Sequence, residues 1–296
     1  MGPLISRREM LLGTLALAAL RPAPSYRIID PHVHVWINDA RYPWAKETIA
    51  PPKKNAAPEM LLALMKANNV ARTVLVQVIY YRWDNRYIAD VLKQYPTYFL
   101  GVCRVNPESP RAPDDLSQLV EQGFRGVRIS PAADASGDWI NGDLMPSLWR
   151  RTQQLKVPMQ VYTSITRIPD VGKLIAKFPE LDVIIDHMAD CPVDQPRELD
   201  KLLALARYPR VFVKISHTWS ISKQPYPWLD AQEHVKRLYA AYGPDRLMWG
   251  TDWPVCEAKT VYSKTLSVVR NDMKFLNDED KSWILSRTMQ KIWRFD

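Results

Sequence analysis

Two histidines one residue apart, His32 and His34, lie near the end of a segment that reads YRIIDPHVHVW. In a β-strand, residues i and i+2 point to the same face, so both imidazoles can face one cavity. Each buried imidazole must satisfy a donor and an acceptor. The pair therefore indicates a bound metal, a polarised substrate oxygen or an internal hydrogen-bond network. An H-x-H pair alone can equally sit on a strand without a function.

Two other short apolar runs also end in residues that bind metals or transfer protons. The run VIIDH ends at His187, and LMWGTDWP contains Asp252. Neutral imidazole and carboxylate are ligands suited to Zn²⁺, and the same groups act as general acids and bases. His32, His34, His187 and Asp252 are therefore the candidate catalytic residues, provided that the fold brings them together.

The elements that would position these residues alternate along the chain. Short apolar runs predict strands buried on both faces, and helical spacing, as in Met60, Leu61 and Leu64, predicts helices between them. Strand ends follow one another at intervals of 24 to 43 residues, close to the ~31 per unit of an eight-unit barrel. The sequence has no glycine-rich dinucleotide-binding turn, which argues against a doubly wound nucleotide-binding sheet. The expected strands are residues 27–34, 72–80, 98–105, 124–129, 157–162, 181–187, 210–216 and 246–252.

This pattern predicts an α/β protein with one (β/α)8 TIM-barrel domain over residues 26–296. Active sites of such barrels lie at the carboxyl ends of the strands, so polar residues there become site candidates. The predicted strand ends carry His34, Gln77, Arg104, Arg128, Tyr162, His187, Ser216 and Asp252. Polar residues that end otherwise apolar strands are what this architecture predicts for an enzyme.

Two guanidinium groups, of Arg104 and Arg128, end neighbouring strands and could bind an acidic substrate, because their planar forks match carboxylates. Ion pairs with acids of the barrel are the alternative. Gln77 and Tyr162 could orient the substrate, or serve internal bonding and packing.

Two more histidines stand outside the main set. His217 borders the seventh strand, beside Lys214, and is a weaker candidate. His234 lies in a predicted helix and is expected at the surface.

Composition and charge exclude several classes of protein. The chain has 296 residues, 47% of them hydrophobic, and a formal net charge of +8. Its Lys and Arg residues are scattered, which does not predict nucleic-acid binding, and zinc-finger and phosphate-loop spacings are absent. Three cysteines give no disulfide framework. We expect unpaired thiols, with a Cys191–Cys256 disulfide as the alternative in an oxidising compartment.

The N-terminus resembles an export signal of the twin-arginine type. An arginine pair, Arg7 and Arg8, precedes an apolar run to Leu20 with an A-x-A cleavage pattern at residues 16–18. The run is shorter than the ~20 residues of a membrane anchor. We therefore expect residues 1–25 to be signal and linker, and the mature protein to be periplasmic and free of the membrane. The alternative is an amphipathic N-terminal extension.

The motifs IIDPHVHVW, LVQ, GFRGVRI, DHMADCP and GTDWPV together resemble the amidohydrolase superfamily. The likeness is closest to its branch of barrel hydrolases that contains sugar-lactone hydrolases and pyrone-dicarboxylate lactonase. The chain departs from wider superfamily patterns at three places. Arg128 stands where binuclear members carry a metal-bridging lysine or acid, and Tyr162 stands where metal-dependent decarboxylases carry a histidine. Ala189 and Asp190 replace the usual glycine and lysine after His187.

The resemblance implies a hydrolase that opens a carboxylated or sugar-derived lactone. Asp252 would activate water as a general base, and His32, His34 and His187 would stabilise the oxyanion. We expect no required cofactor, with a single Zn²⁺ on His32, His34, His187 and Asp252 as the alternative. A metal-dependent decarboxylase or amidohydrolase is the nearest competing function, and a non-catalytic exported binding barrel is the competitor of another class. Substrate identity and oligomeric state cannot be read from these residues.

Overall fold

The computed structural model describes residues 26–131 and 138–293. The predicted export signal, residues 1–25, lies outside the described residues and stays a prediction. Among the described residues, no helix is both long and apolar enough to cross a membrane.

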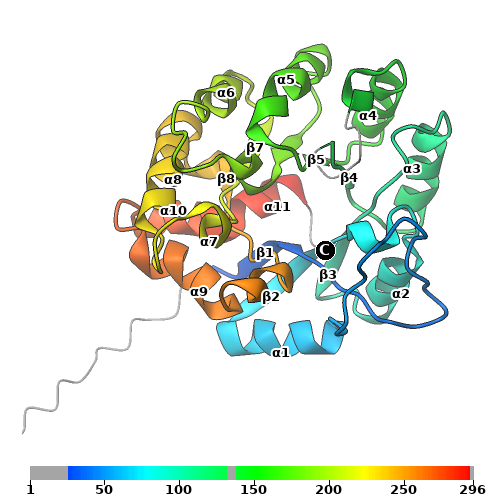
Figure 1. The fold of residues 1–296 in the computed structure, drawn as a ribbon, viewed down its shortest axis with the longest axis horizontal. Helices are drawn as coiled ribbons and strands as arrows, with labels where there is room; N and C mark the ends of the chain where they lie inside the picture. Colours follow the sequence, from blue (N-terminus) through cyan, green and yellow to red (C-terminus); the bar gives the residue numbers. More distant parts are fainter. Residues whose placement is uncertain (1–25, 132–137, 294–296) are drawn as a thin grey trace, which may run out of the picture.

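Eight short parallel strands form the centre of the protein (Figure 1). They are hydrogen-bonded in two groups, ordered β1-β2-β3 and β4-β5-β6-β7-β8. Single parallel bridges, Cys103–Val127 and Val33–Trp253, link the edges of the two groups. The bounds are β1 Ile28–Val33, β2 Val70–Val76, β3 Phe99–Val102, β4 Val127–Ile129, β5 Met159–Val161, β6 Val183–Ile185, β7 Val211–Lys214 and β8 Leu247–Met248. The predicted (β/α)8 barrel is confirmed. Seven strands lie inside their expected ranges, and β2 begins two residues before its range.

Helices surround the strands because each turns an apolar face inward (Figure 1). In α2, for example, Tyr87, Ile88 and Val91 are buried at helical spacing. The short helix α7 was not predicted, because four residues leave no periodic pattern to read. The helices are α1 Pro58–Asn68, α2 Arg86–Gln94, α3 Ala112–Glu121, α4 Met145–Gln154, α5 Ile168–Lys177, α6 Asp200–Leu203, α7 Thr218–Ile221, α8 Leu229–Tyr242, α9 Tyr262–Ser267, α10 Asp278–Ser282 and α11 Thr288–Ile292.

The core has two layers, one between strands and helices and a smaller one that includes strand residues such as Ile184 and Phe212. The second layer also contains Met289 of α11 and Trp293 just beyond it. Trp293 donates its indole N–H to the carbonyl of Arg125, which precedes β4, at 2.9 Å. The C-terminal helix therefore covers the amino ends of the strands, and the carboxyl ends carry the polar residues.

A buried carboxylate, that of Asp30, ties the first strand to the segment after the last. Its Oδ1 accepts the backbone N–H groups of His32 and Thr251, at 3.2 and 3.1 Å. Its Oδ2 accepts the hydroxyls of Thr251 and Tyr262, at 2.5 and 2.9 Å. These four bonds fix the segment that carries His32 against the segment that carries Asp252. Burial, opposed by these hydrogen bonds, raises the pKa of Asp30 from 3.8 to about 6.

We predict that Asp30→Asn changes how stability depends on pH. The folded protein keeps the Asp30 proton up to about pH 6, whereas the unfolded chain loses it near the reference pKa of 3.8. The wild-type stability that this group contributes is therefore fully present below pH 4 and falls as the pH rises through 6. A shift of roughly two pKa units corresponds to about 3 kcal/mol. Urea unfolding of both proteins at pH 4 and pH 7 should show that difference, and a pH-independent difference would contradict it.

Candidate active site

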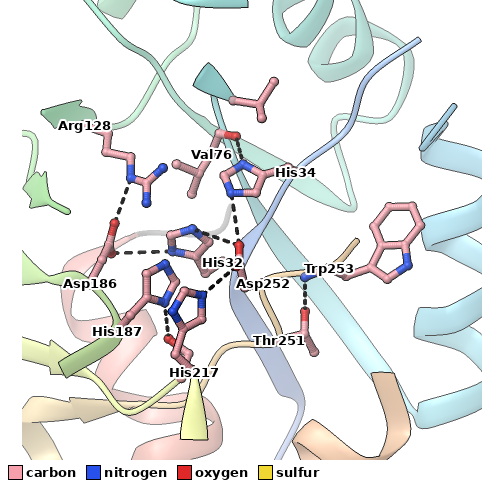
Figure 2. Close-up of polar contacts among 12 residues, drawn as sticks. His32, His34, Val76, Arg128, Asp186, His187, His217, Thr251, Asp252 and Trp253 are labelled. Carbon is pink, nitrogen blue, oxygen red and sulfur yellow. Dashed lines mark hydrogen bonds and ion pairs between the residues drawn. The ribbon is translucent and has the colours of Figure 1, made fainter. Parts of the chain in front are cut away.

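The four candidate catalytic residues meet at the carboxyl ends of the strands (Figure 2). The ring centroids of His32 and His34 lie 5.1 Å apart, and those of His32 and His187 lie 4.4 Å apart. Asp252 reaches the same place from the segment after β8, since its backbone N–H bonds the carbonyl of His32 at 2.9 Å. The structure thus places side chains separated by more than 200 positions in one cluster.

The carboxylate of Asp252 lies at the centre of this cluster and is only 3% exposed. Its Oδ2 lies 2.7 Å from Nε2 of His217. Its Oδ1 lies 3.1 Å from Nε2 of His34 and 3.6 Å from Nε2 of His32. Burial alone would raise its pKa, but the hydrogen bond from His217 and the charge of His217 hold the pKa of Asp252 well below its usual value. The carboxylate is therefore ionised at neutral pH.

His217 bonds two carboxylates, which the sequence alone did not reveal. Its Nδ1 lies 2.8 Å from Oδ1 of Asp190, and its Nε2 bonds Asp252. Carboxylates only accept hydrogen bonds, so both ring nitrogens carry protons. Burial opposes this charge, but the bonds to Asp190 and Asp252 raise the pKa of His217 to about 9. The ring stacks on that of His187 at 3.6 Å, and burial together with the His217 charge lowers the pKa of His187 well below its usual value.

Several residues of the site adopt the left-handed backbone conformation that glycine usually supplies. His187 to Asp190 form a turn with φ between 45° and 55°, and His217 and Asp252 have φ of 66° and 57°. Each such non-glycine residue costs about 1–2 kcal/mol. The turn after β6 directs both the imidazole of His187 and the carboxylate of Asp190 toward His217, which explains why Asp190 was missed: nothing in DHMAD marks a left-handed turn.

A second charged group lies beside the imidazoles. Asp186, the residue after β6, accepts a bond from Arg128 Nε to its Oδ2 at 2.9 Å. Its Oδ1 lies 3.0 Å from Nζ of Lys214. Burial would raise the pKa of Asp186, but the charges of Lys214 and Arg128 hold it well below the usual value. The sequence offered one signal for these residues, namely charged side chains at the ends of strands otherwise buried and apolar.

The residues expected to bind substrate have different surroundings. Arg128 lies over the ring of Tyr162 at 4.9 Å and pairs with Asp186, so the ion-pairing alternative holds for its Nε. Its terminal nitrogens have no hydrogen-bond partner among the described residues. Arg104 is 1% exposed and donates to Ser130 at 2.7 Å. Gln77 is fully buried and bonds its own loop. Arg128 and Tyr162 therefore remain next to the imidazoles, whereas the contacts of Arg104 and Gln77 are internal.

His234 was expected at the surface, and that prediction is wrong. It is 2% exposed and its Nε2 lies 3.3 Å from the carbonyl of Pro192. The inward face of α8 is wide enough to include it beside Val235 and Leu238, which are also buried. The three cysteines are buried and unpaired.

Three residues of the site could hold a metal ion. Ligand atoms of His32, His187 and Asp252 lie within 4.8 Å of one another. Nε2 of His32 and Oδ1 of Asp252 are buried and have no hydrogen-bond partner among the described residues. Burial and the charge of Lys214 lower the pKa of His32 to about 3, which keeps the ring neutral. The donor set fits one divalent ion in kind and spacing. His34 is not in this group, and its Nδ1 bonds the carbonyl of Val76 at 2.6 Å.

The fold is thus an eight-stranded barrel with H-x-H at the end of its first strand, a histidine after the sixth and an aspartate after the eighth. The chain belongs to the amidohydrolase family, whose model matches residues 29–295.

Individual proteins show the same likeness. An L-fucono-1,5-lactonase of Burkholderia ambifaria is 29% identical over 77% of this chain and 80% of its own length. A 2-pyrone-4,6-dicarboxylate hydrolase of Comamonas testosteroni is 26% identical over 84% of this chain and 85% of its own. The crystal structure of an amidohydrolase from Burkholderia multivorans with bound zinc has a TM-score of 0.75 at 20% identity, covering 90% of this chain and 98% of that one. That structure establishes the shared fold.

We predict that Asp190→Asn lowers the pKa of His217. The substitution removes one of the two carboxylates whose hydrogen bonds raise that pKa to about 9, and it leaves the bond to Asp252 in place. An NMR titration of the histidine ring signals measures this directly. Asp194→Asn, nearby in the same loop, is the matched control and should leave the titration unchanged. An unchanged pKa in Asp190→Asn would show that Asp190 does not stabilise the charge of His217.

Proposed function

We propose that the protein is a lactone hydrolase in which Asp252 activates water. The observation that carries the proposal is the setting of this carboxylate: His217 binds one oxygen, and the other faces His32 and His34 in a buried site. The names of the relatives support it, since the L-fucono-1,5-lactonase and the 2-pyrone-4,6-dicarboxylate hydrolase both act on cyclic esters.

The proposed reaction begins with a water molecule beside Oδ1 of Asp252. Oδ1 takes a proton from this water as the water oxygen attacks the lactone carbonyl. His217 keeps Oδ2 occupied, so Oδ1 is the oxygen that works as the base. N–H groups of His32 or His187 donate to the developing oxyanion. The carbonyl of Val76 can only accept, so Nδ1 of His34 carries a proton and Nε2 faces Asp252 at 3.1 Å. The proton that Oδ1 of Asp252 takes from water can therefore pass to Nε2 of His34, and from there to the leaving alkoxide as the ring opens.

The geometry is compatible with a metal but does not need one for this chemistry. If a divalent ion is bound, His32, His187 and Asp252 would hold it, and it would act as a Lewis acid toward the carbonyl. An alkoxide leaves more readily than an amide nitrogen, so opening a lactone demands less electrophilic help than cleaving an amide. We therefore favour a metal-independent reaction. A metal-dependent decarboxylase or amidohydrolase stays the second candidate, favoured by the His32–His187–Asp252 cluster.

We further propose that the substrate carries a carboxylate. The terminal nitrogens of Arg128 are cationic donors beside the imidazole cluster, and the ring of Tyr162 holds the guanidinium in place. Burial, with Asp190 as a further cause, raises the pKa of Tyr162, so its hydroxyl stays a donor.

Asp252→Asn is predicted to lower kcat on lactones by about a thousandfold or more, since general-base catalysis contributes typically 10²–10⁴-fold. Ring opening releases acid, so a panel of lactones can be followed by proton release with and without chelator. Asp245→Asn, which changes a carboxylate in a surface pair with Lys291, is the control. An active Asp252→Asn protein would remove this residue from the mechanism, and chelator-sensitive activity would favour the metal-dependent candidate. Saturable lactone binding without turnover would favour the non-catalytic binding barrel.

Arg128→Gln should raise KM for carboxylated lactones by about 10- to 100-fold, the equivalent of one charge-assisted bond of ~1.5–3 kcal/mol. KM for a neutral lactone of the same ring should stay within about threefold, which separates substrate binding from any effect of losing the pair with Asp186. Arg125→Gln alters an exposed arginine three positions earlier and should change neither value. An equal rise in KM for both substrates would contradict the assignment of Arg128 to the substrate carboxylate.

A further inference from the structure

The buried lysine at the end of β7, Lys214, contacts the back of a catalytic imidazole. Its ammonium nitrogen lies 2.9 Å from Nδ1 of His32 and 2.9 Å from Oε1 of Gln160. It also lies 3.0 Å from Oδ1 of Asp186. Lys214, Gln160 and His32 are all fully buried. A side chain with three N–H groups thus faces three potential acceptors in a place that water does not reach.

Two contacts of Nδ1 of His32 bear on which ring nitrogen carries the proton. Nζ of Lys214 lies 2.9 Å from Nδ1, and Oδ1 of Asp186 lies farther away, at 3.5 Å. An ammonium group has donors and no acceptor, so it is satisfied at 2.9 Å only if Nδ1 of His32 presents its lone pair. A neutral imidazole that accepts at Nδ1 must carry its proton on Nε2. The carboxylate of Asp186, 3.0 Å from the same nitrogen, pairs with the ammonium form of Lys214.

We propose that Lys214 is a positioning residue that holds His32 in the Nε2–H tautomer, as an oxyanion donor and not as a metal ligand. Nε2 is the nitrogen that faces Oδ1 of Asp252, at 3.6 Å. It is buried and has no hydrogen-bond partner among the described residues, as expected of a donor whose acceptor arrives with the substrate.

The same contact opposes metal binding at His32. A metal on Nε2 needs the lone pair there, so the ring proton would have to move to Nδ1, directly against the ammonium group. The pair of His32 and Lys214 would have to lose a proton, or Lys214 would have to withdraw to Asp186 and Gln160. Lys214 therefore favours the use of His32 as a hydrogen-bond donor over its use as a zinc ligand. The role of His32 as an oxyanion donor rests on the proposed function, but the position of its ring proton can be measured without any substrate.

The decisive experiment is ¹⁵N NMR of the histidine rings, which distinguishes the two neutral tautomers. The chain has five histidines, and the spectrum of His32→Gln identifies the His32 signals. In the wild-type protein His32 should show a protonated Nε2 and an unprotonated Nδ1. A wild-type His32 protonated on Nδ1 overturns the inference even if no variant of Lys214 folds.

Two substitutions then test the cause. Lys214→Met removes the donor at similar length and should shift His32 toward the Nδ1–H tautomer, which can donate to Asp186. Arg128→Met is the matched control, because it also removes one positive charge next to Asp186 but leaves Nδ1 of His32 in contact with Lys214. The control should keep the wild-type tautomer. A shift in both variants would assign the effect to charge alone and refute a specific role for Lys214.

Zinc affinity gives an independent readout. Side chains that contact a metal-binding residue from behind typically change metal affinity by 10- to 100-fold. Lys214→Met should therefore bind Zn²⁺ at least tenfold more tightly than the Arg128→Met control, measured by competition with a chelating dye. Equal affinities would contradict the proposed opposition to the metal.

In the lactone assay, Lys214→Met should lower kcat by about 10²-fold with little change in KM, the effect of losing one oxyanion donor. If no protein of the set hydrolyses lactones, the proposed function fails while the tautomer result still stands.

Discussion

The ionised carboxylate of Asp252 is the constraint on which the rest of the site depends. A carboxylate that is 3% exposed would ordinarily take up a proton. It stays charged because His217, itself held as a cation by Asp190, donates to one of its oxygens. The chain Asp190–His217–Asp252 therefore pairs two negative charges with one positive charge and leaves one oxygen available to substrate water. The imidazoles of His32 and His187 next to this carboxylate are neutral, so they do not form ion pairs with Asp252.

The protein maintains this arrangement at a cost in backbone energy. Left-handed residues at His187, His217 and Asp252 place the three side chains where regular strand ends would not. The bonds that Asp30 accepts from Thr251 and Tyr262 join β1 to the segment after β8 and so help to hold Asp252 in this conformation. Lys214 adds a second constraint, because it contacts Nδ1 of His32 and so fixes that imidazole. The site is thus positioned by buried polar contacts between strand ends, while the apolar layers hold the strands themselves.

Much of this architecture could be predicted from the sequence. Apolar runs at regular spacing were sufficient for the eight strands, because strands of a parallel barrel are buried on both faces. The barrel geometry then made residues at strand ends neighbours in space, and so His32, His34, His187 and Asp252 were found together. Their residue types are also distinctive, since few buried strands end in imidazole or carboxylate without a reason.

The partners of these residues could not be predicted in the same way. Asp190 reaches His217 only through a left-handed turn that no glycine marks, and His217 lies just beyond its strand in a similarly unmarked conformation. Lys214 and His32 are separated by 182 positions, and their contact depends on the tilt of side chains inside the barrel. Gln77 and Arg104 occupy strand ends as expected, yet their contacts are internal. Strand-end position thus indicates which residues can enter the site, and side-chain packing decides which do.

The most direct test of the account is a crystal structure of the Asp252→Asn protein with an unreacted carboxylated lactone. We expect the lactone carbonyl carbon beside residue 252 with a water molecule between them, the carbonyl oxygen directed at the imidazoles, and the substrate carboxylate on Arg128. A lactone bound with its carbonyl turned away from residue 252, or bound outside the barrel mouth, would contradict it.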